Sequence, residues 1–179
     1  LPMLPTQILL NNMLYDTSEI PIPLDRVDEE EVRAPRVLDM KFIRNFMFVI
    51  GPVSSLFDFL MFYVLLSVMH ADERMFQTGW FVESLCTQVL VIIVIRTRGN
   101  PLRSRPHPAL LLTSLSIVLL AALLPLLPVG SWFGFVSMPP GFYGILALMV
   151  GSYLLLVEFA KRIFYRYFST EKILVDTKS

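Results

Sequence analysis

The chain has 179 residues, of which 55% are hydrophobic and 17% are charged. Soluble domains are usually about 45–50% apolar and about 25% charged, so this composition indicates a membrane protein and argues against a soluble enzyme. The 15 basic and 15 acidic residues cancel, which does not favour a nucleic-acid-binding protein, and the single Cys86 excludes an internal disulfide.

The first apolar segment, at about 1–20, is interrupted by Pro2, Pro5 and several polar residues. Within it, Asn12 and Asp16 are four residues apart and therefore share one face of a helix. A charge deep in a bilayer costs roughly 2.5–3.5 kcal/mol on the insertion scale, so it usually faces a partner or an ion path. Amide and carboxylate oxygens are the ligands that hard cations such as Mg²⁺ and Ca²⁺ prefer. Chemistry alone leaves a cation site and interhelical hydrogen bonding equally open.

Four further apolar segments follow at about 42–69, 78–95, 108–127 and 141–160. A span needs about 20 residues, and only helices and closed barrels satisfy their backbone groups in lipid. Because strand alternation is absent, the chain is predicted to be all-α, a polytopic membrane bundle of five transmembrane helices. We expect one membrane domain at 1–168 and a cytosolic tail at 169–179.

The basic residues fall unevenly among the predicted connections. If all five segments span, every Lys and Arg except Arg74 lies on one side, together with an acidic run at 28–31. The positive-inside rule makes that side cytoplasmic. The chain is thus expected to start at the outer face and to end in the cytosol.

Other polar groups fall inside the predicted spans. We expect Asp58 to pair with a polar group on another helix, and Glu83 to approach the outer interface. Gln88 lies deeper and can offer a carbonyl oxygen. Glu158 and Arg162 are four residues apart, which predicts an ion pair within one helix.

Several expected features of an ATP-hydrolysing domain are missing from this sequence. It has no Gly-rich phosphate loop and no Asp-Lys-Thr-Gly phosphorylation motif, and no polar stretch exceeds about 25 residues. We therefore expect no catalytic and no cofactor-binding residue in this chain. It also begins inside a hydrophobic run, as a piece of a longer protein would.

Two motifs carry a resemblance to a known family. The first is Leu4-Pro5-Thr6-Gln7-Ile8-Leu9-Leu10-Asn11-Asn12-Met13-Leu14-Tyr15-Asp16, and it resembles the sixth transmembrane helix of P-type cation ATPases. Its ending, Asn-Asn-x-Leu-Tyr-Asp, looks most like the bacterial magnesium-transporting branch. The second is Ile95-Arg96-Thr97-Arg98-Gly99-Asn100, which resembles the end of the eighth helix. The resemblance covers nearly the whole chain and implies helices six to ten of a ten-helix membrane domain.

The resemblance also implies a set of metal ligands. Asn12 and Asp16 match the two ion-ligand positions of the sixth helix, and Gln88 matches a ligand position of the eighth. Asn11 is a secondary candidate beside them. Tyr15 stands where calcium pumps have Thr, and Val91 where sodium pumps have an acid, so neither a calcium-type nor a sodium-type site is expected.

The implied function is that of a membrane fragment of an ATP-driven pump that imports Mg²⁺ across the bacterial inner membrane. ATP would bind only to cytosolic domains outside this chain. The expected partners are the lipid bilayer, Mg²⁺, and the remaining helices and cytosolic domains of the parent ATPase, with no nucleic acid. The alternatives are a stand-alone membrane scaffold or regulatory subunit, and a small oligomeric transporter without ATPase activity.

Overall fold

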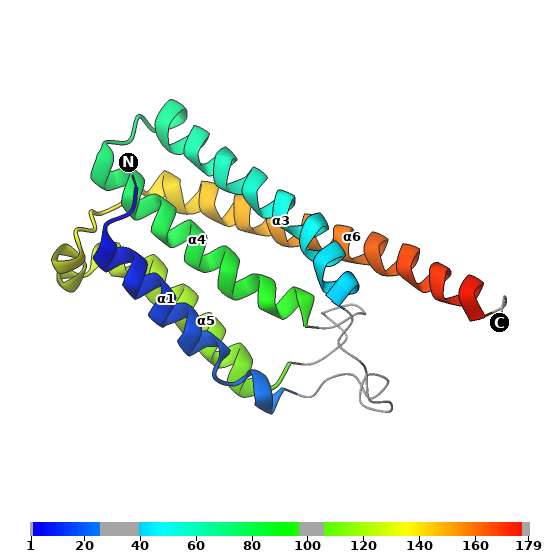
Figure 1. Cartoon of the computed structure of the whole chain (residues 1–179). Coiled ribbons are helices and arrows are strands. Elements are labelled where there is room, and N and C mark those ends of the chain that lie inside the picture. Colours follow the sequence, from blue (N-terminus) through cyan, green and yellow to red (C-terminus); the bar gives the residue numbers. More distant parts are fainter. Residues whose placement is uncertain (1, 26–39, 97–105, 177–179) are drawn as a thin grey trace.

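The computed structural model describes residues 2–25, 40–96 and 106–176. The acidic run at 28–31 and the motif residues at 97–100 lie outside the described residues. The described part is helical and contains no strand (Figure 1), which confirms the predicted all-α fold. Four of its helices are long and apolar enough to cross a membrane.

The first predicted span forms a shorter helix than expected. Helix α1 covers Pro5–Glu19, and a 3-10 turn, η1, follows at Ile22–Leu24. Proline at the first helical position is favourable because its missing N–H would have no partner there. The 15 residues of α1 extend about 22 Å at 1.5 Å each, less than the roughly 30 Å hydrocarbon core. Helix α1 is thus too short to cross the hydrocarbon core by itself.

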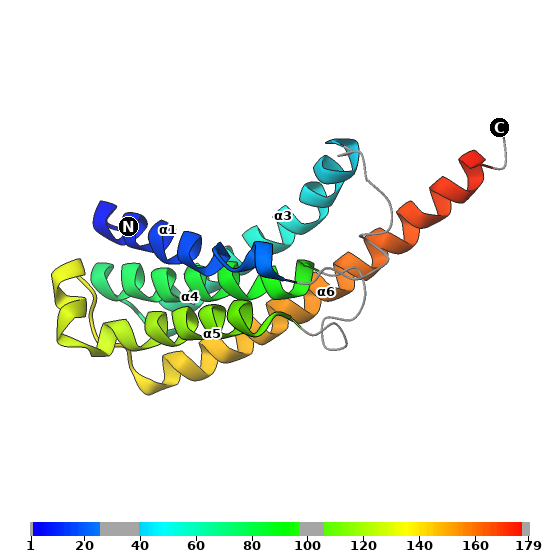
Figure 2. The ribbon, with the colours of Figure 1, turned by 90° about the horizontal axis from the view of Figure 1, so that it is seen from below.

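The second predicted span matches α3, at Met40–Tyr63, which continues as a π-helical turn, η2, at Val64–Val68. Pro52 lies inside α3 and removes one hydrogen bond from the helix ladder. The first turns of α3 diverge from α4 and α5 in Figure 2. There Phe46 packs edge-on against Phe164, with 5.3 Å between ring centroids.

Helix α4, at Glu73–Ile95, is the centre of the bundle. It packs against α1 and α3 and also against two later helices, α5 (Pro108–Leu123) and α6 (Pro140–Asp176), as Figures 1 and 2 show. It begins five residues before the predicted span, because Asp72 caps its first turn by accepting a 2.8 Å hydrogen bond from the Met75 amide. Because the residues of that turn are polar, hydropathy alone does not indicate where the helix begins.

The last two spans end differently from their predictions. Helix α5 passes into two 3-10 turns, η3 at Leu124–Leu126 and η4 at Pro128–Phe133, and Gly134 closes η4 with a φ of 75°. Helix α6 has 37 residues and extends well past the predicted end near 160. The Glu158 carboxylate pairs with Lys161 and Arg162, each at 2.6 Å, which supports the helix beyond its apolar part. The expected pair of Glu158 with Arg162 is confirmed.

The expectation that Glu83 approaches the outer interface stays a prediction. Its side chain faces the core, and the residue is only 1% exposed. The reason is its position on the central helix, where neighbouring helices cover nearly every face. Asp58 on α3 is half-buried.

Candidate cation site on the first helix

Helix α1 has one face against the bundle and one face away from it. The buried face carries Gln7, Leu10, Asn11, Leu14 and Ser18, and it meets α4 and α5. The opposite face is exposed and includes Leu9, which is 71% exposed, and Met13, which is 56% exposed. A helix that packs on one side only divides its residues in this way.

Asn12 and Asp16 both lie on the exposed face of α1. Their spacing of four residues puts the amide and the carboxylate one turn apart along the helix. No basic side chain within the described ranges forms an ion pair with Asp16. The two candidate ligands therefore offer their oxygens to whatever lies on this side of α1, and not to the bundle behind it.

The two secondary candidates, Asn11 and Gln88, lie together on the other side of the helix. The Asn11 Nδ2 group donates a 3.2 Å hydrogen bond to Gln88 Oε1, and Gln88 Nε2 donates at 3.0 Å to Ser84 Oγ. Asn11 Oδ1 is buried and has no hydrogen-bond donor among the residues that the structure describes. The sequence places these groups 77 positions apart, and the fold joins them across the contact between α1 and α4.

Near Pro2, two glutamines hold α1 in place. Gln7 Nε2 donates a 3.1 Å hydrogen bond to the Phe133 carbonyl, and Gln7 Oε1 accepts one of 3.2 Å from the Leu4 amide. On α4, Gln77 Nε2 donates at 2.8 Å to the Pro2 carbonyl. These contacts fix the start of α1 against both α4 and η4.

At the other end of α1, Asp25 joins three segments. Its Oδ2 atom forms a 2.7 Å ion pair with Arg96 Nη1 at the end of α4, and both side chains are 8% exposed. Its Oδ1 atom accepts a 2.7 Å hydrogen bond from the His107 amide, just before α5. No pattern in the sequence indicated this role for Asp25, because Asp25 lies among other charged residues in a connection and has no helical spacing to its partners. The position of α1 is therefore fixed at both ends.

The described residues supply only part of a metal shell. Asn12 and Asp16 together offer about three oxygens, whereas Mg²⁺ prefers six at about 2.1 Å and often keeps some waters. Within the described ranges, no cluster of three or more His, Cys, Asp or Glu side chains could hold a metal ion. A site at Asn12 and Asp16 would thus need further ligands from outside these residues.

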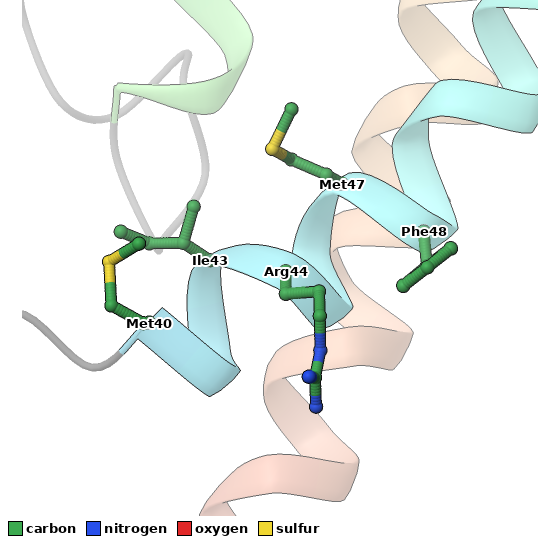
Figure 3. Close-up of a pocket in the computed structure, with 5 residues that line it drawn as sticks. All are labelled: Met40, Ile43, Arg44, Met47 and Phe48. Atoms are coloured by element: carbon green, nitrogen blue, oxygen red, sulfur yellow. The ribbon is translucent and has the colours of Figure 1, made fainter.

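A surface pocket of about 400 Å³ lies elsewhere, at the start of α3 (Figure 3). Its lining residues all come from α3 and are Met40, Ile43, Arg44, Met47 and Phe48. Arg44 is the charged group among them, and a guanidinium repels cations. This pocket therefore does not qualify as a cation site.

Comparison with known proteins places the chain in a family. Residues 1–163 match the family described as "Cation transporting ATPase, C-terminus". The chain is 36% identical over 171 residues to "Magnesium-transporting ATPase, P-type 1" of Salmonella typhimurium strain LT2, and 33% identical over 171 residues to the protein of that name from Escherichia coli strain K12. Each alignment covers 93% of this chain and 19% of the relative, so the chain spans about a fifth of their length. The chain is a multi-pass membrane protein and belongs to the C-terminal membrane region family of the cation-transporting P-type ATPases.

Proposed function

We propose that this chain is the C-terminal membrane region of an ATP-driven pump that imports Mg²⁺, and that Asn12 and Asp16 contribute ligands to its cation site. The observation that carries the proposal is the exposed face of α1. It presents an amide and a carboxylate one turn apart, with no basic partner within the described ranges, on a helix whose other face is hydrogen-bonded to α4. The choice of Mg²⁺ as the ion rests on the names of the relatives.

In this proposal, further helices of the pump cover the exposed face of α1 and complete the metal shell. Asp16 supplies the negative charge that compensates for the dehydration of Mg²⁺, and Asn12 supplies a neutral oxygen. Asn11 and Gln88 act behind them, because their hydrogen bond holds the middle of α1 against α4. ATP binding and phosphorylation take place in cytosolic domains outside this sequence.

The proposal includes an orientation in the bacterial inner membrane. Asp25 contacts Arg96, and Lys161, near Arg162 and Arg166 on α6, contacts Val94 at the same end of α4. At the other end of α4, Arg74 lies one turn before Gln77, which contacts Pro2. Under the positive-inside rule, the end near Asp25 and the C-terminus are cytoplasmic. A membrane-impermeant thiol reagent should then label Trp132→Cys from outside intact cells, since Trp132 is 82% exposed in η4. Labelling of Trp132→Cys only after cell lysis would reverse the orientation.

The ligand role is tested in the longer protein that contains this chain, reconstituted into liposomes. Asp16→Ala should lower Mg²⁺ uptake and Mg²⁺-stimulated ATP hydrolysis by at least about 10–100-fold, since loss of even an indirect metal contact costs that much. Asn12→Ala should weaken Mg²⁺ affinity by less, because it removes a neutral ligand.

Glu19→Gln is the matched control for Asp16→Ala, because it also removes a carboxylate from α1 but from a position outside the proposed ligand pair. Its transport should stay close to that of the unmodified protein. If the Asp16→Ala variant inserts normally and keeps the same Mg²⁺ dependence, Asp16 is not a ligand. The alternative of a membrane scaffold that does not transport is then favoured over the proposed cation site.

A further inference from the structure

A second group of polar side chains lies within the membrane-spanning helices and involves helices other than α1. It consists of Ser54 and Asp58 on α3, Glu83 on α4, and Tyr153 on α6, and we name it the α3–α4–α6 cluster. The hydroxyl groups of Ser54 and Tyr153 are 2.9 Å apart and share a hydrogen bond. The side chain of Leu65, in the η2 turn that continues α3, lies against Gly79 on α4, and the two helices run in opposite directions, so Asp58, two turns before Leu65, lies within about one turn of the level of Glu83.

Glu83 is the most deeply buried member of this cluster. The residue is 1% exposed, and its Oε2 atom has no hydrogen-bond donor within the described ranges. No described lysine or arginine forms an ion pair with Glu83 or Asp58. The titratable groups around Glu83 are Asp58 from α3, Tyr153 from α6 and Cys86 from its own helix, and none of them brings a positive charge.

Two ionised carboxylates in this position would be costly. Burying an unpaired carboxylate is unfavourable even after the protein relaxes, and a second negative charge on the neighbouring helix adds repulsion. A proton on Glu83 removes one charge and turns the unpartnered Oε2 into an O–H group that can donate to a neighbour. Acidic side chains inside membrane bundles commonly serve as proton sites.

We propose that Glu83 binds a proton inside the membrane, and that the negative charge of Asp58 on the neighbouring helix α3 favours this proton. A metal ion is the poorer occupant, because the described residues contain no cluster of three or more acidic, His or Cys ligands. Because Glu83 belongs to α4 and Asp58 to α3, the proton favours the packing of these two helices. The inference needs only that these helices span the membrane, and it holds or fails independently of the Mg²⁺ site on α1.

Infrared difference spectroscopy of the longer protein that contains this chain, in lipid nanodiscs at neutral pH, tests the proposal by subtracting each variant's spectrum from that of the unmodified protein. A protonated carboxylic acid has a carbonyl-stretch band that an ionised carboxylate lacks, and it shifts on H/D exchange. Glu83→Gln should remove this band, and Asp58→Asn should keep it at a shifted frequency because the negative charge near the acid is removed. The matched control is Glu73→Gln, the same substitution at an exposed position in the first turn of α4, which should leave the band unchanged.

The result is interpreted only for variants whose helical content by circular dichroism equals that of the unmodified protein. A spectrum in which Glu83→Gln leaves the acid band intact overturns the proposal, and so does an unmodified protein with no such band. An unchanged frequency in Asp58→Asn refutes the influence of Asp58. If adding Mg²⁺ at constant pH removes the band, and does so also in the Asp16→Asn variant, the α3–α4–α6 cluster binds a metal ion and the proton proposal is wrong.

Discussion

The contact of Asp25 with α4 and α5 leads to a quantitative prediction for stability. Asp25→Ala removes a buried ion pair to Arg96 and a hydrogen bond from the His107 amide, both 2.7 Å long. Removing one partner of a buried pair typically costs about 3–5 kcal/mol, because the other charge stays buried. Asp25→Asn also removes the negative charge beside Arg96, but it keeps an oxygen that can accept the His107 hydrogen bond. We therefore expect a smaller loss for Asp25→Asn than for Asp25→Ala, by about the 0.5–1.5 kcal/mol of one hydrogen bond.

The assay is equilibrium unfolding of the purified chain in mixed micelles, followed by helical circular dichroism as the SDS fraction rises. The control is Glu73→Gln, which changes an exposed acid and should stay within about 0.5 kcal/mol of the unmodified chain. The free energies of unfolding should fall in the order Glu73→Gln, Asp25→Asn, Asp25→Ala. A loss below about 1 kcal/mol for Asp25→Ala would show that the pair contributes no more than an exposed one, and would refute the inference that it holds α1 in place.

Three further substitutions test the packing of the bundle. A Cβ atom at Gly130 would lie 2.1 Å from the Leu124 carbonyl oxygen, so Gly130→Ala should lower the free energy of unfolding by about 1–3 kcal/mol. A Cβ atom at Gly144, within helix α6, would meet nothing within 4 Å, so Gly144→Ala should raise the free energy of unfolding by about 0.5–1 kcal/mol. Equal effects of the two in the SDS titration would contradict the η4 geometry. Lys161 is fully buried and donates a 2.8 Å hydrogen bond to the Val94 carbonyl at the end of α4, so Lys161→Met should cost about 1.5–3 kcal/mol. An unchanged midpoint for Lys161→Met would show that this contact does not stabilise the fold.

Hydropathy and length predicted the four long helices because lipid permits little besides a helix of about 20 apolar residues. The ends were harder to predict, since they depend on local polar contacts. Asp72 starts α4 among polar residues, and the pairs of Glu158 extend α6 past its apolar part. A hydropathy scale scores residues one at a time, so it includes neither the helix cap at Asp72 nor the ion pairs of Glu158.

The helical period alone determined that Asn12 and Asp16 share a face, because four residues make about one turn. Only the tertiary structure decided that this face points away from α4 and α5, while Asn11, one position earlier, meets Gln88. The same holds for the burial of Glu83, which lies on the central helix. Contacts over 70 or more positions depend on how helices pack, and packing is a property of several segments together, so no single segment of the sequence specifies it.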